Sequence, residues 1–133
     1  MPAKKKIVFD SFALLAYLKK EDGFEKVKRS LADDDVHALT NDVNVGEMYY
    51  IIARERGFDQ ADYFIEIVMP SMPISSVSNA LQGVIEAARI KSKYPLSYAD
   101  CFAVATAYRE KAPLITGDPE FKKVLGLIEI DWL

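Results

Sequence analysis

The sequence predicts an α/β domain in which helices cover both faces of a parallel sheet. Two observations support this prediction. Short apolar or β-branched runs alternate with longer segments of helical character, and no repeat, low-complexity stretch or linker rich in Gly, Pro or Ser divides the 133 residues. Strands that alternate with helices are joined by crossover connections, which produce a parallel sheet between helical layers. We therefore expect a single domain over residues 1–133.

Five segments are expected to form strands. The first is a β-branched run that ends at Asp10, and the fourth, "PLITG", is followed at once by Asp118. The third contains Pro73, which has no backbone N–H to donate, so this strand is expected at an edge of the sheet. In chain order the five segments are residues 6–10, 36–40, 72–77, 113–117 and 127–133.

Six segments have the character of helices. In the second, Phe24, Val27 and Leu31 recur at intervals of three and four residues, which places them on one helical face. The third ends before Gly57, a common signal for the end of a helix. The sixth is nearly uncharged, as buried helices are. In chain order the six segments are residues 11–20, 23–32, 43–56, 59–69, 78–92 and 97–109.

The composition narrows the class of protein. A formal net charge of −3 argues against a general basic surface that would bind nucleic acid by its field alone. The single cysteine cannot form an internal disulfide, which favours a reducing, cytoplasmic location. The basic start "MPAKKK" is followed by an apolar run too short for a signal peptide, and no apolar stretch reaches the length of a membrane span. We therefore expect a soluble protein that does not contact a membrane.

Four acidic residues stand in positions where the sequence is otherwise apolar. Asp10 and Asp118 follow the first and fourth predicted strands, and sites in open α/β sheets lie beyond the carboxyl ends of strands. If these two strands are neighbours, the two carboxylates converge. Glu47 is the only charged residue in "VNVGEMYYIIA", and Asp100 is the only one from Leu96 to Tyr108.

Each acid also has a structural interpretation. Asp10 could cap the helix that follows it, Asp118 could stabilise a turn or cap a helix, and Glu47 could pair with Arg54 or a lysine. Asp100 is harder to explain in this way, because its helix carries no cation before Arg109. Burying an unpaired carboxylate costs several kcal/mol. Asp100 must therefore be paired, lie at a helix end that faces a cleft, or bind a positive group.

One common cause accounts for all four acids, namely a divalent cation. Four carboxylates that converge repel one another, so that at least one holds a proton near neutral pH unless a cation is bound. Oxygen ligands suit Mg²⁺ or Mn²⁺, and the chain has no Cys/His cluster of the kind that binds zinc. Acidic clusters that hold such ions hydrolyse phosphodiesters with a metal-activated water.

The chain resembles the PIN-domain family in four motifs. These are "IVFDSFALLA" (7–16), the isolated Glu47, "LSYADCFAVATA" (96–107) and "LITGDPEF" (114–121), in that order along the chain. The size of the chain is similar to that of the VapC-like toxins of type II toxin–antitoxin systems. This resemblance implies a three-layer α/β/α sandwich around a central, mostly parallel sheet of four to five strands. It also implies a ribonuclease dependent on Mg²⁺ or Mn²⁺, usually a homodimer, which a cognate antitoxin protein holds inactive.

The resemblance also assigns roles to individual residues. The catalytic and metal-binding acids it implies are Asp10, Glu47, Asp100 and Asp118. The polar residues expected to support them by hydrogen bonds are Ser11, Thr116 and Asn44, with Asn41 as an alternative to Asn44. Two further acids, Asp42 and Glu120, lie close to the motifs and could replace a main ligand.

Other residues support weaker interpretations. Cys101 is expected to be a small core residue and His37 to have a structural or surface role. The basic cluster Arg89, Lys91 and Lys93 precedes the helix of Asp100 and is a candidate for contact with RNA phosphates. The apolar helices at 43–53 and 59–69 suggest a dimer face.

Rival protein classes fit the pattern less well. A receiver-type signalling domain would need an acid after the third strand, and "MPISSV" has none. A haloacid-dehalogenase-type phosphatase would need Asp-x-Asp at the first strand, and "FDSFA" lacks the second Asp. Two alternatives stay open: an RNA-processing PIN nuclease without an antitoxin, and a catalytically inactive PIN-like binding module.

Overall fold

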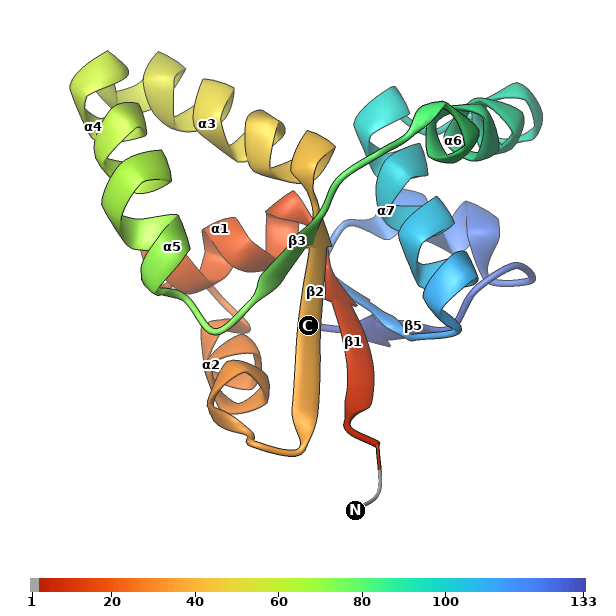
Figure 1. Ribbon diagram of the computed structural model, residues 1–133, viewed down its shortest axis with the longest axis horizontal. Helices are drawn as coiled ribbons and strands as arrows, with labels where there is room; N and C mark the ends of the chain where they lie inside the picture. Colours follow the sequence, from red (N-terminus) through yellow and green to blue (C-terminus); the bar gives the residue numbers. More distant parts are fainter. Residues whose placement is uncertain (1–2) are drawn as a thin grey trace.

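A five-stranded parallel sheet forms the centre of the molecule (Figure 1). The computed structural model describes residues 3–133. The strands lie in the order β3-β2-β1-β4-β5, and each neighbouring pair is parallel. Their bounds are β1 Lys5–Phe9, β2 Val36–Asn41, β3 Ser75–Val77, β4 Leu114–Thr116 and β5 Ile130–Trp132. The predicted fold class, the parallel sheet and the five strands are confirmed.

Helices cover both faces of this sheet, as predicted. Helices α1 to α5 lie on one side of it and α6 and α7 on the other (Figure 1). Two short segments depart from α-helical geometry: η1 is a π-helical turn between α4 and α5, and η2 is a 3₁₀-helix after β4. The bounds are α1 Ser11–Lys19, α2 Phe24–Ala32, α3 Asp42–Arg56, α4 Phe58–Tyr63, η1 Phe64–Val68, α5 Met69–Ser71, α6 Leu81–Lys93, α7 Tyr98–Glu110 and η2 Pro119–Val124.

The alternation of side chains along the strands separates two apolar cores. In β1, Val8 joins the core against α7, whereas Ile7 and Phe9 join the core against α1, α2 and α3. In β4, Leu114 and Ile115 divide in the same way. Successive side chains of a strand point to opposite faces, so each central strand contributes to both cores and the molecule has three layers.

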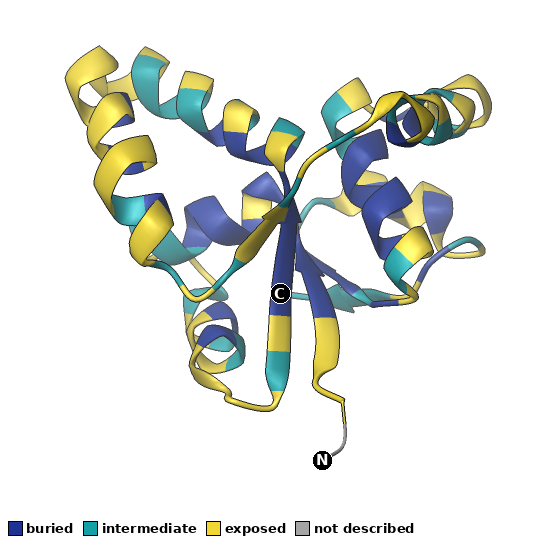
Figure 2. Ribbon diagram, viewed as in Figure 1, coloured by how far each residue is buried: buried dark blue, intermediate teal, exposed yellow. Residues whose placement is uncertain are grey.

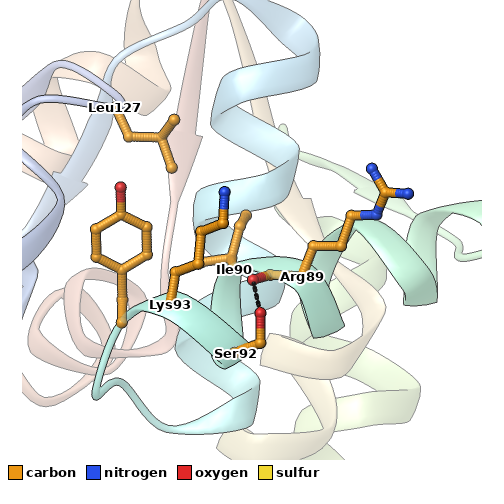
Figure 3. A pocket seen from close by; sticks show the side chains of 6 residues that line it. Arg89, Ile90, Ser92, Lys93 and Leu127 are labelled. Atoms are coloured by element: carbon orange, nitrogen blue, oxygen red, sulfur yellow. Dashed lines mark hydrogen bonds between the residues drawn. The ribbon is translucent and has the colours of Figure 1, made fainter.

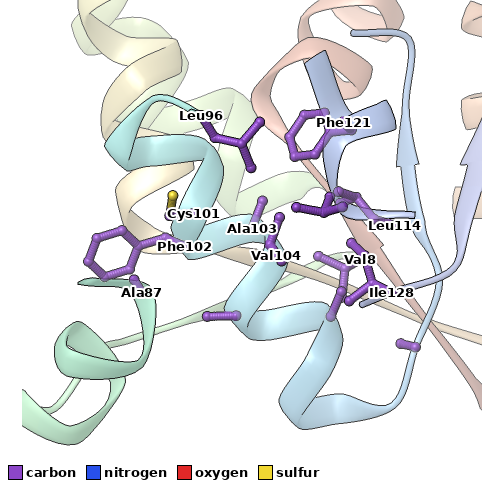
Figure 4. Packing of buried hydrophobic residues seen from close by; sticks show 14 of the residues in the cluster. Val8, Ala87, Leu96, Cys101, Phe102, Ala103, Val104, Leu114, Phe121 and Ile128 are labelled. Carbon is purple, nitrogen blue, oxygen red and sulfur yellow. The ribbon is translucent and has the colours of Figure 1, made fainter. Parts of the chain in front are cut away.

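Burial follows this layering. The central strands are buried along most of their length. Most helices bury one face and expose the other, whereas the middle of α7 is buried on all sides (Figure 2). Figure 4 shows the α7 core, where Cys101, Val104 and Leu114 pack with Val8 and Phe121. The Cys101 side chain is fully buried, which confirms its expected role as a core residue, and burial raises the pKa of its thiol. His37 is exposed on β2, as expected for a surface residue.

Four predicted segments were wrong in their limits, one of them the strand expected at 127–133, of which only Ile130–Trp132 pairs with β4. The expected strand at 72–77 starts only at Ser75, because Pro73 cannot donate to a neighbouring strand and the Ile74 N–H turns back to the Met72 carbonyl at 2.8 Å. The helix expected at 59–69 is interrupted by η1 and continues into α5. The helix expected from residue 78 starts at Leu81, because Asn79 instead pairs with Asn41.

Within residues 3–133, no helix combines the length and the apolar character that crossing a membrane requires.

Candidate active site

The carboxylate of Asp10 lies between β1 and β4. It caps α1, since its Oδ1 accepts from the Ala13 N–H at 2.8 Å, and its Oδ2 accepts from the Thr116 hydroxyl at 2.6 Å. Only 1% of the residue is exposed, and this burial raises the pKa of Asp10 to about 7 against the lowering effect of both hydrogen bonds. The charges of Asp100 and Asp118 raise that pKa further. The helix cap is therefore real, but it does not remove the cost of ionising Asp10.

Thr116 joins two of the predicted acids. It ends β4, which pairs with β1 through Phe9 and Ile115, so the neighbouring arrangement of the first and fourth strands is confirmed. The buried Thr116 hydroxyl donates to Asp10 and accepts from the Asp118 N–H at 3.0 Å. The Asp118 carboxylate caps η2 by accepting from the Glu120 N–H at 3.0 Å. One hydroxyl thus holds both acids at the carboxyl ends of adjacent strands.

Asp100 lies in the first turn of α7. Ser97 caps this helix, and its hydroxyl accepts from the Asp100 N–H at 3.1 Å. The Asp100 side chain is partly buried, and burial raises its pKa to about 6. Glu47, Asp118 and Glu120 raise it further by repulsion between like charges. Asp100 is therefore at a helix end, whereas the cleft and the bound positive group that were expected for it stay predictions.

Glu47 lies on α3 and faces α1. Its carboxylate accepts a hydrogen bond from the Ser11 hydroxyl, which belongs to the first turn of α1. The alternative pairing with Arg54 is wrong, because the Arg54 guanidinium lies over the ring of Tyr50, 5.2 Å from its centre. Ser11 and Thr116 therefore each donate to one acid of the predicted set.

Asn44 connects α3 to the start of α7. It is fully buried and its Nδ2 donates to the Ala99 carbonyl at 3.2 Å, next to Asp100. Its Oδ1 is buried and has no hydrogen-bond partner within residues 3–133. Of the two asparagines considered, Asn44 is therefore the one beside the acids.

Asn41 has a different role. Its side chain caps α3 through the Val43 N–H, exchanges two hydrogen bonds with Asn79 and donates to the Thr106 hydroxyl. It therefore stabilises the junction of β2, α3 and α7 and contacts none of the four acids directly.

The two additional acids lie differently. Asp42 is exposed and accepts from the Ser76 hydroxyl of β3, so it turns away from the cluster. Glu120 is exposed and paired with Lys123, yet it is close enough to raise the pKa of Asp100. Ser97 was missed by the sequence analysis, although a serine three residues before an acid is a known pattern at the start of a helix.

The basic cluster Arg89, Lys91 and Lys93 lies beside a hollow between α6 and the segment before β5. This hollow is lined by Arg89, Ile90, Ser92, Lys93, Tyr94 and Leu127 and contains no carboxylate (Figure 3). The Arg89 side chain extends away from Lys93 rather than toward it (Figure 3). Burial raises the pKa of the Cys101 thiol, and the nearby charge of Lys91 lowers it. The basic cluster therefore lies near the first turns of α7. The expected contact with RNA phosphates stays a prediction.

The four predicted acids thus form one electrostatic cluster. Asp10 interacts with Asp100 and Asp118, and Asp100 interacts with Glu47 and Asp118. All the side chains offer hard oxygen donors, which suit Mg²⁺ or Mn²⁺. As arranged in residues 3–133, no three acidic, His or Cys side chains are close enough to hold a metal ion together. The fit to such an ion therefore lies in the chemistry of the carboxylate donors and not in their present distances.

Comparison with known proteins gives a consistent family. A model of the PIN domain matches residues 7–127. The solved structure of VapBC2 from Rickettsia felis, bound to a DNA fragment from the promoter, is similar with a TM-score of 0.73 and 12% identity, covering 96% of this chain and 98% of that one. A Mycobacterium tuberculosis protein, VapC20, described as a sarcin–ricin loop cleaving toxin, is similar with a TM-score of 0.72 and 17% identity, covering 93% and 98%.

A third similar structure is DNA-bound VapBC from Salmonella typhimurium. Its TM-score is 0.73 and its identity 13%, and the similarity covers 96% of this chain and 98% of that chain. The comparison with curated proteins finds no match. At these identities the solved structures support the fold, and the match of the domain model supports the family.

Proposed function

This chain belongs to the PIN-domain family, and we propose that it is a ribonuclease dependent on a divalent metal ion and the toxin of a toxin–antitoxin pair. One observation carries the proposal. Acids from four separate parts of the chain lie near one another, at the carboxyl ends of β1 and β4, on α3 and in the first turn of α7. The Thr116 hydroxyl binds both Asp10 and the Asp118 N–H, and neighbouring acids add to the raised pKa values of Asp10 and Asp100. A protein gains nothing for its stability from such repulsion, whereas a cation-dependent site requires it.

In this proposal Asp10, Glu47, Asp100 and Asp118 would hold Mg²⁺ or Mn²⁺. When bound, the ion supplies an activated water and positive charge beside the phosphate oxygens of RNA. The chain itself positions the acids: Thr116 orients Asp10 and the backbone before Asp118, and Ser11 orients Glu47. Asn44 fixes the backbone that precedes Asp100.

The proposed partners are an RNA substrate, a cognate antitoxin and a second copy of the chain, in the cytoplasm. The similar solved structures include VapBC from Salmonella typhimurium and FitAB bound to DNA, which supports an antitoxin partner. Exposed apolar side chains on α4 and η1 support a homodimer face, namely Phe58, Tyr63, Ile65 and Ile67.

Two alternatives have the same acids. A PIN nuclease that processes RNA without an antitoxin would keep the cluster and lack the partner. An inactive PIN-like binding module would keep the fold and not cleave. The intact cluster favours an active enzyme over the binding module.

The direct test is cleavage of fluorescent single-stranded RNA with Mn²⁺ or Mg²⁺, with EDTA and with Asp100→Asn. Asp34→Asn, an exposed acid in the turn before β2, is the matched control. Cleavage that requires both the metal and Asp100, and that Asp34→Asn retains, supports the proposal. Equal cleavage by wild type and Asp100→Asn would indicate contamination, and no cleavage combined with no Mn²⁺ binding would favour the binding module.

A further inference from the structure

Phe12 is an exposed aromatic residue at the edge of the acidic cluster. It is the second residue of α1, two positions after Asp10. Its neighbours Ser11, Ala13 and Leu14 are buried, but 45% of Phe12 is exposed. Its exposed ring therefore leaves apolar area in contact with water beside a charged site, and neither the core nor the four acids explain its presence.

Gly117 provides a seat for this ring. A Cβ atom at position 117 would lie closer than 3.0 Å to Cε1 of Phe12, a separation that real Cβ atoms essentially never show, and 3.1 Å from its Cδ1 and Cζ. The backbone of Gly117 is not among those in the left-handed region, so its conformation does not demand glycine. The ring of Phe12 instead occupies the space that a side chain at position 117 would need. Gly117 also connects Thr116 to Asp118, so the ring rests on the loop that carries one of the acids.

We propose that Phe12 binds single-stranded RNA by stacking on a nucleobase next to the phosphate that the acids receive. This inference rests on the proposed function. Aromatic side chains provide stacking platforms of this kind in proteins that bind single strands, and every base has a face that can stack. The ring lies against Gly117 and the residue is 45% exposed, so Phe12 offers apolar area to a base.

The position of Phe12 favours a nucleobase over a protein segment as the occupant. The acids repel a phosphodiester until a cation is bound, so they supply little affinity for RNA by themselves. A base is joined through its sugar to the phosphate at the acids and therefore must lie on a wall of the site. Phe12 forms such a wall, since it contacts the residue between Thr116 and Asp118.

The first experiment separates binding from catalysis. KM and kcat are measured for a fluorescent single-stranded RNA with Mn²⁺, and binding of the same RNA is measured by anisotropy in the Asp100→Asn background, where it stays intact. Loss of one stacked base should weaken binding and raise KM about 5- to 100-fold in Phe12→Ala. A change in KM with kcat kept within about twofold indicates lost substrate binding rather than a damaged site. Phe12→Trp should restore the affinity and Phe12→Leu should not.

The second experiment uses the seat of the ring. Gly117→Ala should displace Phe12 and cause a similar rise in KM. In the Phe12→Ala background the same substitution should cost nothing further, because there is no ring left to displace. Tyr108→Ala is the control, since this tyrosine is 61% exposed but lies in the last turn of α7, at the end opposite Asp100. Its KM should stay that of wild type.

Three results would overturn the inference. If metal- and Asp100-dependent cleavage persists with unchanged KM in Phe12→Ala, the proposed function stands and stacking by Phe12 is wrong. If Phe12→Ala changes the oligomeric state in light scattering without changing RNA binding, the ring is a protein contact. If wild type cleaves no RNA, the enzyme proposal fails. RNA binding that still depends on Phe12 would then support stacking, whereas a lack of RNA binding would reject both the enzyme proposal and the stacking.

Discussion

The substitution Asp10→Asn should stabilise the metal-free protein at alkaline pH and abolish the proposed activity. Asp10 is almost fully buried, and its pKa is raised from 3.8 to about 7, mainly by that burial. The folded protein therefore keeps a proton between about pH 4 and pH 7 that the unfolded chain has released. Because the folded state binds more protons in this window, the free energy of unfolding falls as pH rises through it.

The magnitude follows from the size of the shift. A rise of about three pKa units corresponds to about 4 kcal/mol, since each unit is worth about 1.4 kcal/mol. Asparagine is neutral at every pH and avoids this cost, but it no longer accepts the hydrogen bond of the Thr116 hydroxyl, which costs about 1 kcal/mol. The variant should be more stable than wild type by about 3 kcal/mol at pH 8 and about equal to it at pH 4.5. At pH 8 this corresponds to a rise in Tm of roughly 10 °C.

The assay is thermal and urea unfolding followed by circular dichroism with EDTA at both pH values. Asp34→Asn, which changes an exposed acid, should alter stability by less than about 0.5 kcal/mol at either pH. If Asp10→Asn destabilises the protein equally at pH 4.5 and pH 8, ionisation of Asp10 does not lower the free energy of unfolding of wild type. The reasoning that the apo site is electrostatically strained would then be refuted.

The remaining predictions concern the metal, the pH dependence, Asn44 and the dimer. Mn²⁺ at a hundredfold excess over its Kd should stabilise wild type by about 2.7 kcal/mol in thermal unfolding, and it should stabilise Asp10→Asn much less. Equal stabilisation of the two proteins would mean that the ion binds elsewhere. Because Asp10 and Asp100 hold protons below pH values of about 7 and about 6, Mn²⁺ should bind more tightly at pH 7.5 than at pH 5.5 and release protons. Calorimetry in buffers of different ionisation enthalpy measures that release, and its absence would contradict the ligand assignment. Asn44→Ala should lower the free energy of unfolding by about 1–3 kcal/mol in urea. It should also lower kcat, because the backbone before Asp100 loses its hydrogen bond from Asn44. An unchanged kcat would mean that Asn44 has only a structural role. If the proposed homodimer forms through α4 and η1, Ile67→Glu should give a monomer in light scattering. Ile85→Glu, at a similarly exposed site on α6, should leave that dimer intact, and the reverse result would move the interface to α6.

The predicted site and the observed geometry differ in an instructive way. From the sequence, a helix cap at Asp10 and a functional carboxylate were alternatives. In the structure, one oxygen of Asp10 accepts a hydrogen bond from the Ala13 N–H and the other accepts one from the Thr116 hydroxyl. Glu47 pairs with Ser11 and not with Arg54, because Arg54 is held over Tyr50. Each of these contacts depends on which residues of other helices and strands lie nearby. A local sequence pattern does not predict those neighbours.

The sequence by itself determined the fold class and the five strands, and it singled out the four acids that we propose for the site. Apolar runs with a period of two or near 3.6 define strands and helices locally, and an acid inside such a run is conspicuous because burying it is costly. These signals depend only on neighbours along the chain.

Only the tertiary structure decided how the acids meet. Thr116 reaches Asp10 across 106 positions of sequence because β4 pairs with β1, and Phe12 rests on Gly117 for the same reason. The late start of α6 also depends on a distant contact, since Asn79 pairs with Asn41. Strand order follows from the simultaneous packing of both faces of the sheet. The contacts that form the site join residues far apart in the sequence, and no periodic pattern along the chain predicts them.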